Sequence, residues 1–163
     1  MGARKLVTLA LVAVALVLTA RYLFWNDRRD VRRRLDTIAE TVTNIGGETP
    51  PEAVSAAARL GTFVTDDVII RTDASTFVGG RPAVVKLALD AVATRKRMKV
   101  STGDVAVELI DRSTATVFFT LGISDDDPQT PDPAPSQMHA TFVKQDGDWL
   151  LTRAEVLRTL EGR

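Results

Sequence analysis

The sequence predicts an α+β fold, in which a curved antiparallel sheet wraps around three helices and is preceded by one transmembrane helix. The 15 residues from Leu6 to Ala20 carry no charge. Between residues 31 and 92, three segments place apolar residues at helical spacing. From residue 98 onward apolar and polar residues alternate, as they do in half-buried strands. Helices followed by strands within one chain indicate an α+β domain.

Composition and charge exclude several classes of site. The 163-residue chain has no cysteine and therefore no disulfide framework, and its single histidine, His139, excludes a site that needs two imidazoles. It lacks a nucleotide-binding glycine motif and zinc spacing, so we expect no metal and no cofactor. The net charge of zero divides into +6 over residues 1–34 and −6 over residues 35–163. A basic end on an acidic body argues against nucleic-acid binding and suggests a phospholipid membrane as its partner.

Residues 1–25 are predicted to be an N-terminal membrane anchor. From Leu6 through Trp25 the segment counts 20 residues, which at about 1.5 Å each span a hydrocarbon layer of about 30 Å. Arg21 can extend to the headgroups, and Tyr22 and Trp25 suit the interfacial aromatic belt. A cleaved signal peptide is one alternative, but a cut after residue 20 would place a leucine at the −3 position. A buried core helix, the other alternative, is rarely this apolar on every face.

The charges leave open which side of the membrane the domain occupies. Two basic residues precede the apolar run and six arginines follow it, a balance that favours a cytoplasmic domain. A short basic tail before an apolar run is also typical of an export signal, whose downstream domain is translocated. We expect an extracytoplasmic domain on a single-pass anchor.

Residues 26–47 are predicted to form a basic juxtamembrane helix. Apolar residues recur at steps of three and four from Val31 to Ile45, and Gly46-Gly47 ends the pattern. The arginines of its first two turns either contact lipid headgroups or form a solvated helix face. The residues predicted to contact the membrane are Arg21, Tyr22, Trp25, Arg28, Arg29, Arg32, Arg33 and Arg34.

Residues 48–163 are predicted to hold the remainder of the domain. Thr49 and Glu52 form a capping box. The helix that they open is expected to bury Val54 and Val64 and to end at Asp66-Asp67.

The elements that follow are two short strands, one helix and four long strands. The helix begins at Pro82, and Asp146-Gly147 marks the last hairpin. The acidic, proline-rich loop before the third long strand lacks the alternating oxygens and the glycine of a calcium loop. The strands are expected at residues 68–70, 76–78, 98–110, 115–123, 137–145 and 149–157.

Two segments in this order, Thr65-Asp66-Asp67-Val68 and Gly80-Arg81-Pro82-Ala83-Val84, resemble the nuclear transport factor 2-like superfamily, and within it the SnoaL-like branch. Asp146-Gly147-Asp148-Trp149 supports the resemblance, which covers roughly residues 31–160. It implies a cystatin-like cone whose mouth can hold a small apolar ligand. The superfamily includes isomerases, dehydratases, cyclases, ligand sensors and protein-binding members, so the resemblance does not decide the activity. The ligand-binding residues that it implies are Phe77, Val107, Phe118, Phe142 and Trp149.

Three residues are candidates for a catalytic base. In the steroid isomerases of this superfamily the base follows the Asp-Asp pair by five residues, and Thr72 stands there in this chain, which cannot accept a proton at neutral pH. Asp73 is its neighbour, but an offset of one residue on a strand points to the opposite face. His139 titrates near neutrality in its ordinary state, and Glu108 lies on another expected strand. By alternation, His139 lies on the face opposite Phe142.

Two functions remain. The first, which we favour, is a non-catalytic, membrane-anchored domain that binds a partner protein, such as a second copy through the open sheet face, or a small apolar ligand at the membrane surface. The second is a SnoaL-like isomerase, cyclase or dehydratase that acts on a hydrophobic substrate. An enzyme of that kind requires one of the candidate bases inside its pocket.

Overall fold

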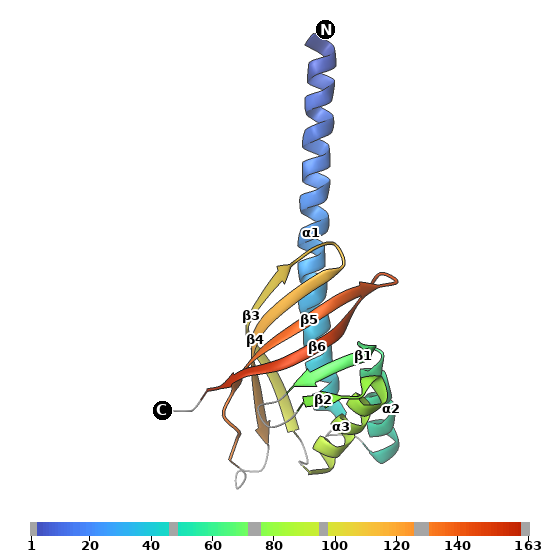
Figure 1. Cartoon of the computed structure of the whole chain (residues 1–163), viewed down its shortest axis with the longest axis vertical. Helices are drawn as coiled ribbons and strands as arrows, with labels where there is room; N and C mark the ends of the chain where they lie inside the picture. The colour runs from blue at the N-terminus through green and yellow to red at the C-terminus, as the bar shows by residue number, and fades with distance from the viewer. Residues whose placement is uncertain (1–2, 46–48, 72–75, 95–97, 126–130, 161–163) are drawn as a thin grey trace.

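The computed structural model describes residues 3–45, 49–71, 76–94, 98–125 and 131–160. Within these residues it contains three helices and the expected six strands (Figure 1). In chain order they are α1 (Ala3–Ile45), α2 (Pro50–Gly61), β1 (Val64–Arg71), β2 (Thr76–Val78), α3 (Gly80–Thr94), β3 (Met98–Leu109), β4 (Thr114–Asp125), β5 (Ser136–Gln145) and β6 (Asp148–Thr159).

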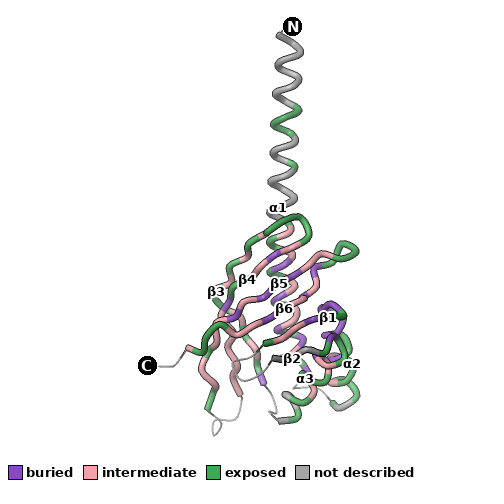
Figure 2. Tube along the Cα trace, viewed as in Figure 1, coloured by how far each residue is buried: buried purple, intermediate pink, exposed green. Residues whose placement is uncertain are grey.

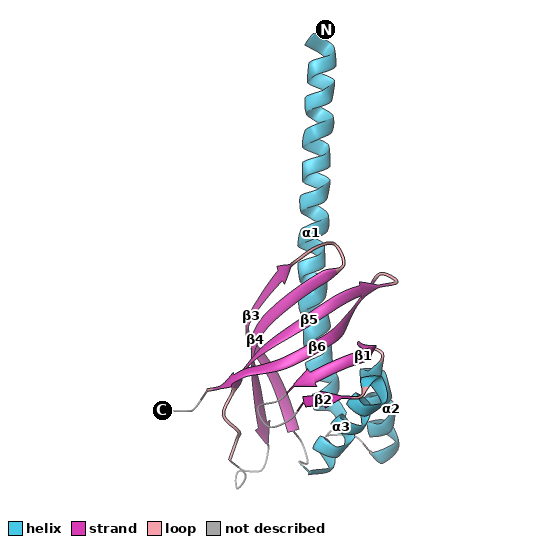
Figure 3. Ribbon diagram, in the orientation of Figure 1, coloured by secondary structure: helices cyan, strands magenta, loops and turns pink. Residues whose placement is uncertain are grey.

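The strands form one curved sheet in the order β2-β1-β6-β5-β4-β3. It wraps around the C-terminal part of α1, and α2 and α3 lie at its β1–β2 end (Figure 3). The prediction of a wholly antiparallel sheet is wrong at one pair, because β1 runs parallel to β6. The chain leaves α2 beside β6, the last strand. There the backbone N–H of Leu151 donates to the carbonyl oxygen of Phe63 at 2.9 Å.

The concave face of the sheet packs on α1. The stripe predicted on this helix is buried, with Val31, Leu35 and Ile45 at most 5% exposed, and it meets Val117 of β4 and Phe142 of β5, both fully buried. Buried and half-buried positions alternate along these strands (Figure 2). Removal of apolar surface from water is therefore what holds the helix inside the curve of the sheet.

Polar contacts fix α1 at both ends of its buried stretch. Near its C-terminus the Thr43 hydroxyl accepts a hydrogen bond from the backbone N–H of Val100 at 2.9 Å. At the other end of the stretch the Lys144 ammonium lies 2.7 Å from an Asp27 carboxylate oxygen, and both side chains are mostly buried. These contacts set the position of the helix along the sheet, which the apolar stripe alone does not.

Helix α1 joins the predicted anchor and the predicted juxtamembrane helix into one helix of 43 residues. Its N-terminal half extends beyond the sheet (Figure 1). In the described part of the chain, no helix has both the length and the apolar character that a membrane crossing requires. Most side chains of residues 1–25 lie outside the described set, so the anchor stays a prediction from the sequence.

The region after α2 differs from the prediction. The helix ends at Gly61 instead of at Asp66-Asp67, and both aspartates lie within β1. Val54 is 58% exposed instead of buried. Glycine at position 61 lets α2 lie close to α3, because a Cβ there would lie 3.1 Å from side-chain carbons of Arg81 and Val85 on α3.

The two segments that carried the family resemblance contact each other. Arg81 donates to an Asp66 carboxylate oxygen at 3.1 Å and to the Val64 carbonyl oxygen at 3.3 Å. Gly80 has a φ of +70°, and a Cβ there would lie 2.1 Å from the Asp66 carbonyl oxygen. Glycine is therefore required at this position. The role of both segments is to join α3 to β1.

Candidate functional site

The convex face of the sheet carries the first candidate site, a cluster on β4, β5 and β6. His139 Nδ1 lies 2.9 Å from a Glu155 carboxylate oxygen, and because a carboxylate only accepts, Nδ1 carries the proton. The Phe118 ring stacks on the imidazole with centroids 4.7 Å apart. Phe118 and Leu157 are 44% and 51% exposed, so this face presents apolar surface around a polar centre.

The charge of Glu155 is stabilised by its neighbours. The hydrogen bond from His139 is the largest cause that lowers the pKa of Glu155 below its ordinary value of 4.5, with smaller contributions from Arg153 and Arg71. Arg153 Nε is buried and has no partner among the described residues. Glu155 is thus an ionised acceptor that orients the imidazole and is not a proton donor near neutral pH.

The candidate bases do not gather inside the cone. His139 lies on the convex face, opposite Phe142, as alternation predicted. Glu108 is exposed on β3, whose inward positions pack against the core. Asp73 lies outside the described residues. His139 and Glu108 therefore share the uncovered face, while side chains of α1 fill the concave face.

The five residues predicted to line a ligand pocket are also divided between the faces. Phe142 and Trp149 are 0% and 2% exposed, and Val107 packs against the same core. Phe118 stands on the other face, so it cannot share a pocket with Phe142. The side chain of Phe77 lies outside the described residues.

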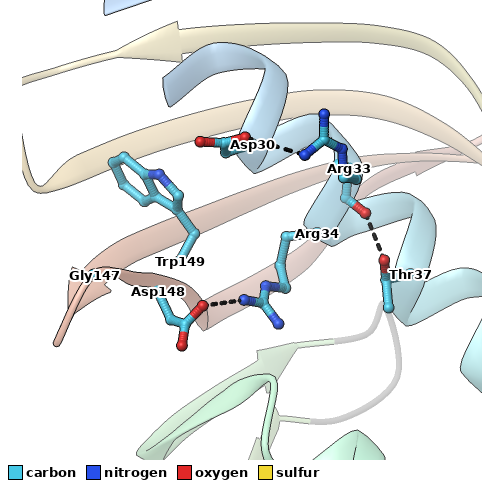
Figure 4. Close-up of a pocket in the computed structure, with 7 residues that line it drawn as sticks. All are labelled: Asp30, Arg33, Arg34, Thr37, Gly147, Asp148 and Trp149. Atoms are coloured by element: carbon cyan, nitrogen blue, oxygen red, sulfur yellow. Dashed lines mark hydrogen bonds and ion pairs between the residues drawn. The ribbon is translucent and has the colours of Figure 1, made fainter. Parts of the chain in front are cut away.

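A second candidate site lies where α1 meets the β5–β6 hairpin (Figure 4). This junction pocket has a volume of about 330 Å³. Arg34 donates to an Asp148 carboxylate oxygen at 2.7 Å, and its guanidinium lies 5.1 Å from the centre of the Phe63 ring. The pocket is lined by Asp30, Arg33, Arg34, Thr37, Gly147, Asp148 and Trp149.

Sequence reasoning found this pocket only in part. Arg33 and Arg34 were expected at a membrane and Trp149 in an apolar site, but Asp30 and Asp148 were not singled out. The two aspartates are 118 positions apart and meet only because the last hairpin lies against α1. The Asp146-Gly147 hairpin was the one available signal. Among the described residues, no cluster of three or more potential metal ligands is present.

Comparison with known proteins identifies the fold. No family model and no curated protein sequence matches the chain. A nuclear transport factor 2-like protein with a cystatin-like fold from Novosphingobium aromaticivorans superposes with a TM-score of 0.73 at 19% identity, covering 90% of each chain. A function-unknown protein from Mycobacterium tuberculosis gives 0.71 at 16% identity, covering 85% of this chain and 74% of its own.

A third solved structure is a hexachlorocyclohexane dehydrochlorinase from Novosphingobium barchaimii. It gives a TM-score of 0.67 at 10% identity, covering 86% of this chain and 92% of its own. At such identities the likeness extends to the fold alone. The chain has the nuclear transport factor 2-like cone fold, as its sequence predicted.

Proposed function

We propose that this protein is a membrane-tethered, non-catalytic binding domain whose convex sheet face pairs with a second copy of the chain. The observation that carries the proposal is the composition of that face. It exposes Phe118 and Leu157 around the His139–Glu155 hydrogen bond. The two residues line one hollow, and a contiguous apolar patch rimmed by polar residues is typical of protein-binding surfaces.

Charge complementarity supports a second copy as the partner. Arg71 and Arg153 lie on the β1 and β6 side of the convex face, whereas Asp104 and Glu108 lie on the outer strand β3. A two-fold axis near Phe118 would bring the basic side of one copy to the acidic side of the other. A hollow of about 130 Å³, lined by residues that include Phe118, Gln137 and Leu157, offers room for an apolar side chain of the partner.

The tether is supported by the sequence of α1. An uncharged run of 15 residues and the arginine-rich turns after it lie on one continuous helix. The N-terminal half of that helix, which begins at Ala3, extends beyond the edge of the sheet (Figure 1). The facing of the domain is proposed to be extracytoplasmic.

The second candidate function is a SnoaL-like enzyme that acts on a hydrophobic substrate. The observation in its favour is the carboxylate–imidazole pair, because Glu155 holds Nδ1–H and leaves Nε2 of His139 as an acceptor. Its site would be the convex face and not the cone. A small apolar ligand, rather than a protein, would in that case be bound beside Phe118.

The experiment is to measure self-association of the full chain in uncharged detergent by analytical ultracentrifugation. Phe118→Glu places a charge at the centre of the proposed contact and is expected to weaken association at least tenfold, about 1.4 kcal/mol. Val54→Glu is the matched control, since Val54 is also an exposed apolar residue, 58% against 44% for Phe118, but lies on α2. A chain that stays monomeric at high concentration, or equal effects of the two variants, would contradict pairing through this face.

A further inference from the structure

The geometry points to a ligand site in the junction pocket between α1 and the β5–β6 hairpin, and to a zwitterion of the phosphoethanolamine type as its ligand. The pocket volume of about 330 Å³ is at the small end of ligand sites, so it suits a headgroup and not a whole lipid. Its lining comes from two elements that the core already fixes. The backbone of the site is therefore in place before a ligand arrives.

The charges of the pocket are mixed. A guanidinium nitrogen of Arg33 lies 3.5 Å from an Asp30 carboxylate oxygen. A guanidinium nitrogen of Arg34 lies 2.7 Å from an Asp148 carboxylate oxygen. A simple anion would meet two carboxylates there, and a simple cation would meet two guanidinium groups. A ligand that carries both charges on neighbouring atoms matches both pairs. Each guanidinium has five N–H donors, so donors remain after its contact with aspartate.

Trp149 supplies the observation that points to an acceptor. The residue is 2% exposed, and its indole Nε1–H is buried without a partner among the described residues. Figure 4 shows the indole beside Asp30, across the pocket from Arg33 and Arg34. Burial of an unpaired N–H costs free energy, and a phosphate oxygen that contacts it after a small shift of the indole would remove that cost. The phosphate would then be held by Arg33, Arg34 and Trp149, and the amine by Asp30 and Asp148.

The position of the pocket suggests where the ligand comes from, and this step rests on the proposed tether. Asp30 follows Trp25 by five residues, about 8 Å along a helix. The polar layer of a bilayer extends about 5–8 Å beyond the hydrocarbon on each side. The headgroup of a zwitterionic phospholipid is thus within reach, although a free phosphoethanolamine compound has the same chemistry.

The test is a nuclear magnetic resonance titration of the full chain in uncharged detergent micelles. The chain has two tryptophans, so Trp25→Phe leaves Trp149 as the only indole N–H signal. Phosphoethanolamine and a short-chain phosphatidylethanolamine are the probes, with ethanolamine and inorganic phosphate as half-ligands. A saturable downfield shift of the Trp149 indole proton is expected, with binding at least tenfold weaker for either half-ligand. Saturation by the lipid alone identifies a bilayer source, and saturation by both probes identifies the free compound as sufficient.

Arginine variants separate a pocket from a basic surface. Arg33→Gln is expected to weaken binding about tenfold, the effect of one charge-assisted hydrogen bond. Arg32→Gln, an exposed neighbour on α1 that does not line the pocket, is expected to change it less than about twofold. An indole signal that no probe shifts in the folded chain, or equal effects of the two variants, would overturn the proposal. A failure of the tether would appear separately, as loss of vesicle flotation without any change in this titration.

Discussion

The two faces of the sheet are made by alternate residues of the same strands, yet they differ in what fixes them. On β5, Phe142 is fully buried against α1, while His139, three residues before it, stacks on an exposed phenylalanine. The concave face is determined by burial of apolar surface, and the Asp27–Lys144 ion pair lies at its edge. The convex face is determined by pairwise contacts, and it holds the ionisable candidates. The two described candidate bases, His139 and Glu108, therefore lie outside the core.

The largest expected effect is a difference in the free energy of unfolding between substitutions on the two faces of the sheet. Phe142→Ala should lower the free energy of unfolding by about 3–5 kcal/mol, because it leaves a cavity against α1. Phe118→Ala should lower it by less than about 1 kcal/mol, because the ring is already partly in water. Urea unfolding of the full chain in detergent measures both. Equal losses would show that the convex face is as tightly packed as the concave one.

An intermediate effect, a coupling energy between two charged side chains, is expected at the edge of the concave face. A double-mutant cycle with Asp27→Asn and Lys144→Met should give a coupling of about 1 kcal/mol, because the ion pair is short and mostly buried. The Asp30–Arg33 pair on the same helix is the control, and its coupling should be about 0.3 kcal/mol, since it is longer and more exposed. A smaller coupling at Lys144 than at Arg33 would mean that apolar packing alone positions α1.

The smallest effect is a change in pH dependence on the convex face. The pKa of Glu155 is lowered in the folded chain, chiefly by the hydrogen bond from His139. Its ionised form therefore contributes stability above the ordinary pKa of 4.5, and this contribution is lost as the pH falls through the lower folded value. Glu155→Gln should flatten the stability profile below pH 4.5 and cost less than about 1 kcal/mol at pH 7. An unchanged acid slope would show that the hydrogen bond does not persist in solution.

Much of the fold could be predicted because its signals are local. The capping box at Thr49 and the Asp146-Gly147 hairpin each follow from a few adjacent residues, and both are confirmed. The end of α2 could not be predicted from adjacent residues, because the chain that follows it pairs with β6, where Val64 lies opposite Leu151.

The candidate sites were less predictable than the fold. The pairing of His139 with Glu155 depends on the register of β5 and β6, which includes two irregularities that alternation does not reveal. The junction pocket depends on contacts between residues more than 100 positions apart. Some residues of each site could be predicted from the sequence, but their arrangement in space could not.

Helix α1 contains no proline and no glycine from Ala3 to Ile45, so it has no ordinary kink position. Because the helix is continuous, the orientation of the sheet about the helix axis is fixed relative to the N-terminal end of α1. One alanine inserted after Trp25 would turn the sheet by about 100° and move it by about 1.5 Å. Four inserted alanines would bring the sheet close to its original orientation about the helix axis, but farther from the N-terminal end of the helix. Under the proposed tether, binding of a partner held at the membrane would change with this rotation, and binding of a free partner would not.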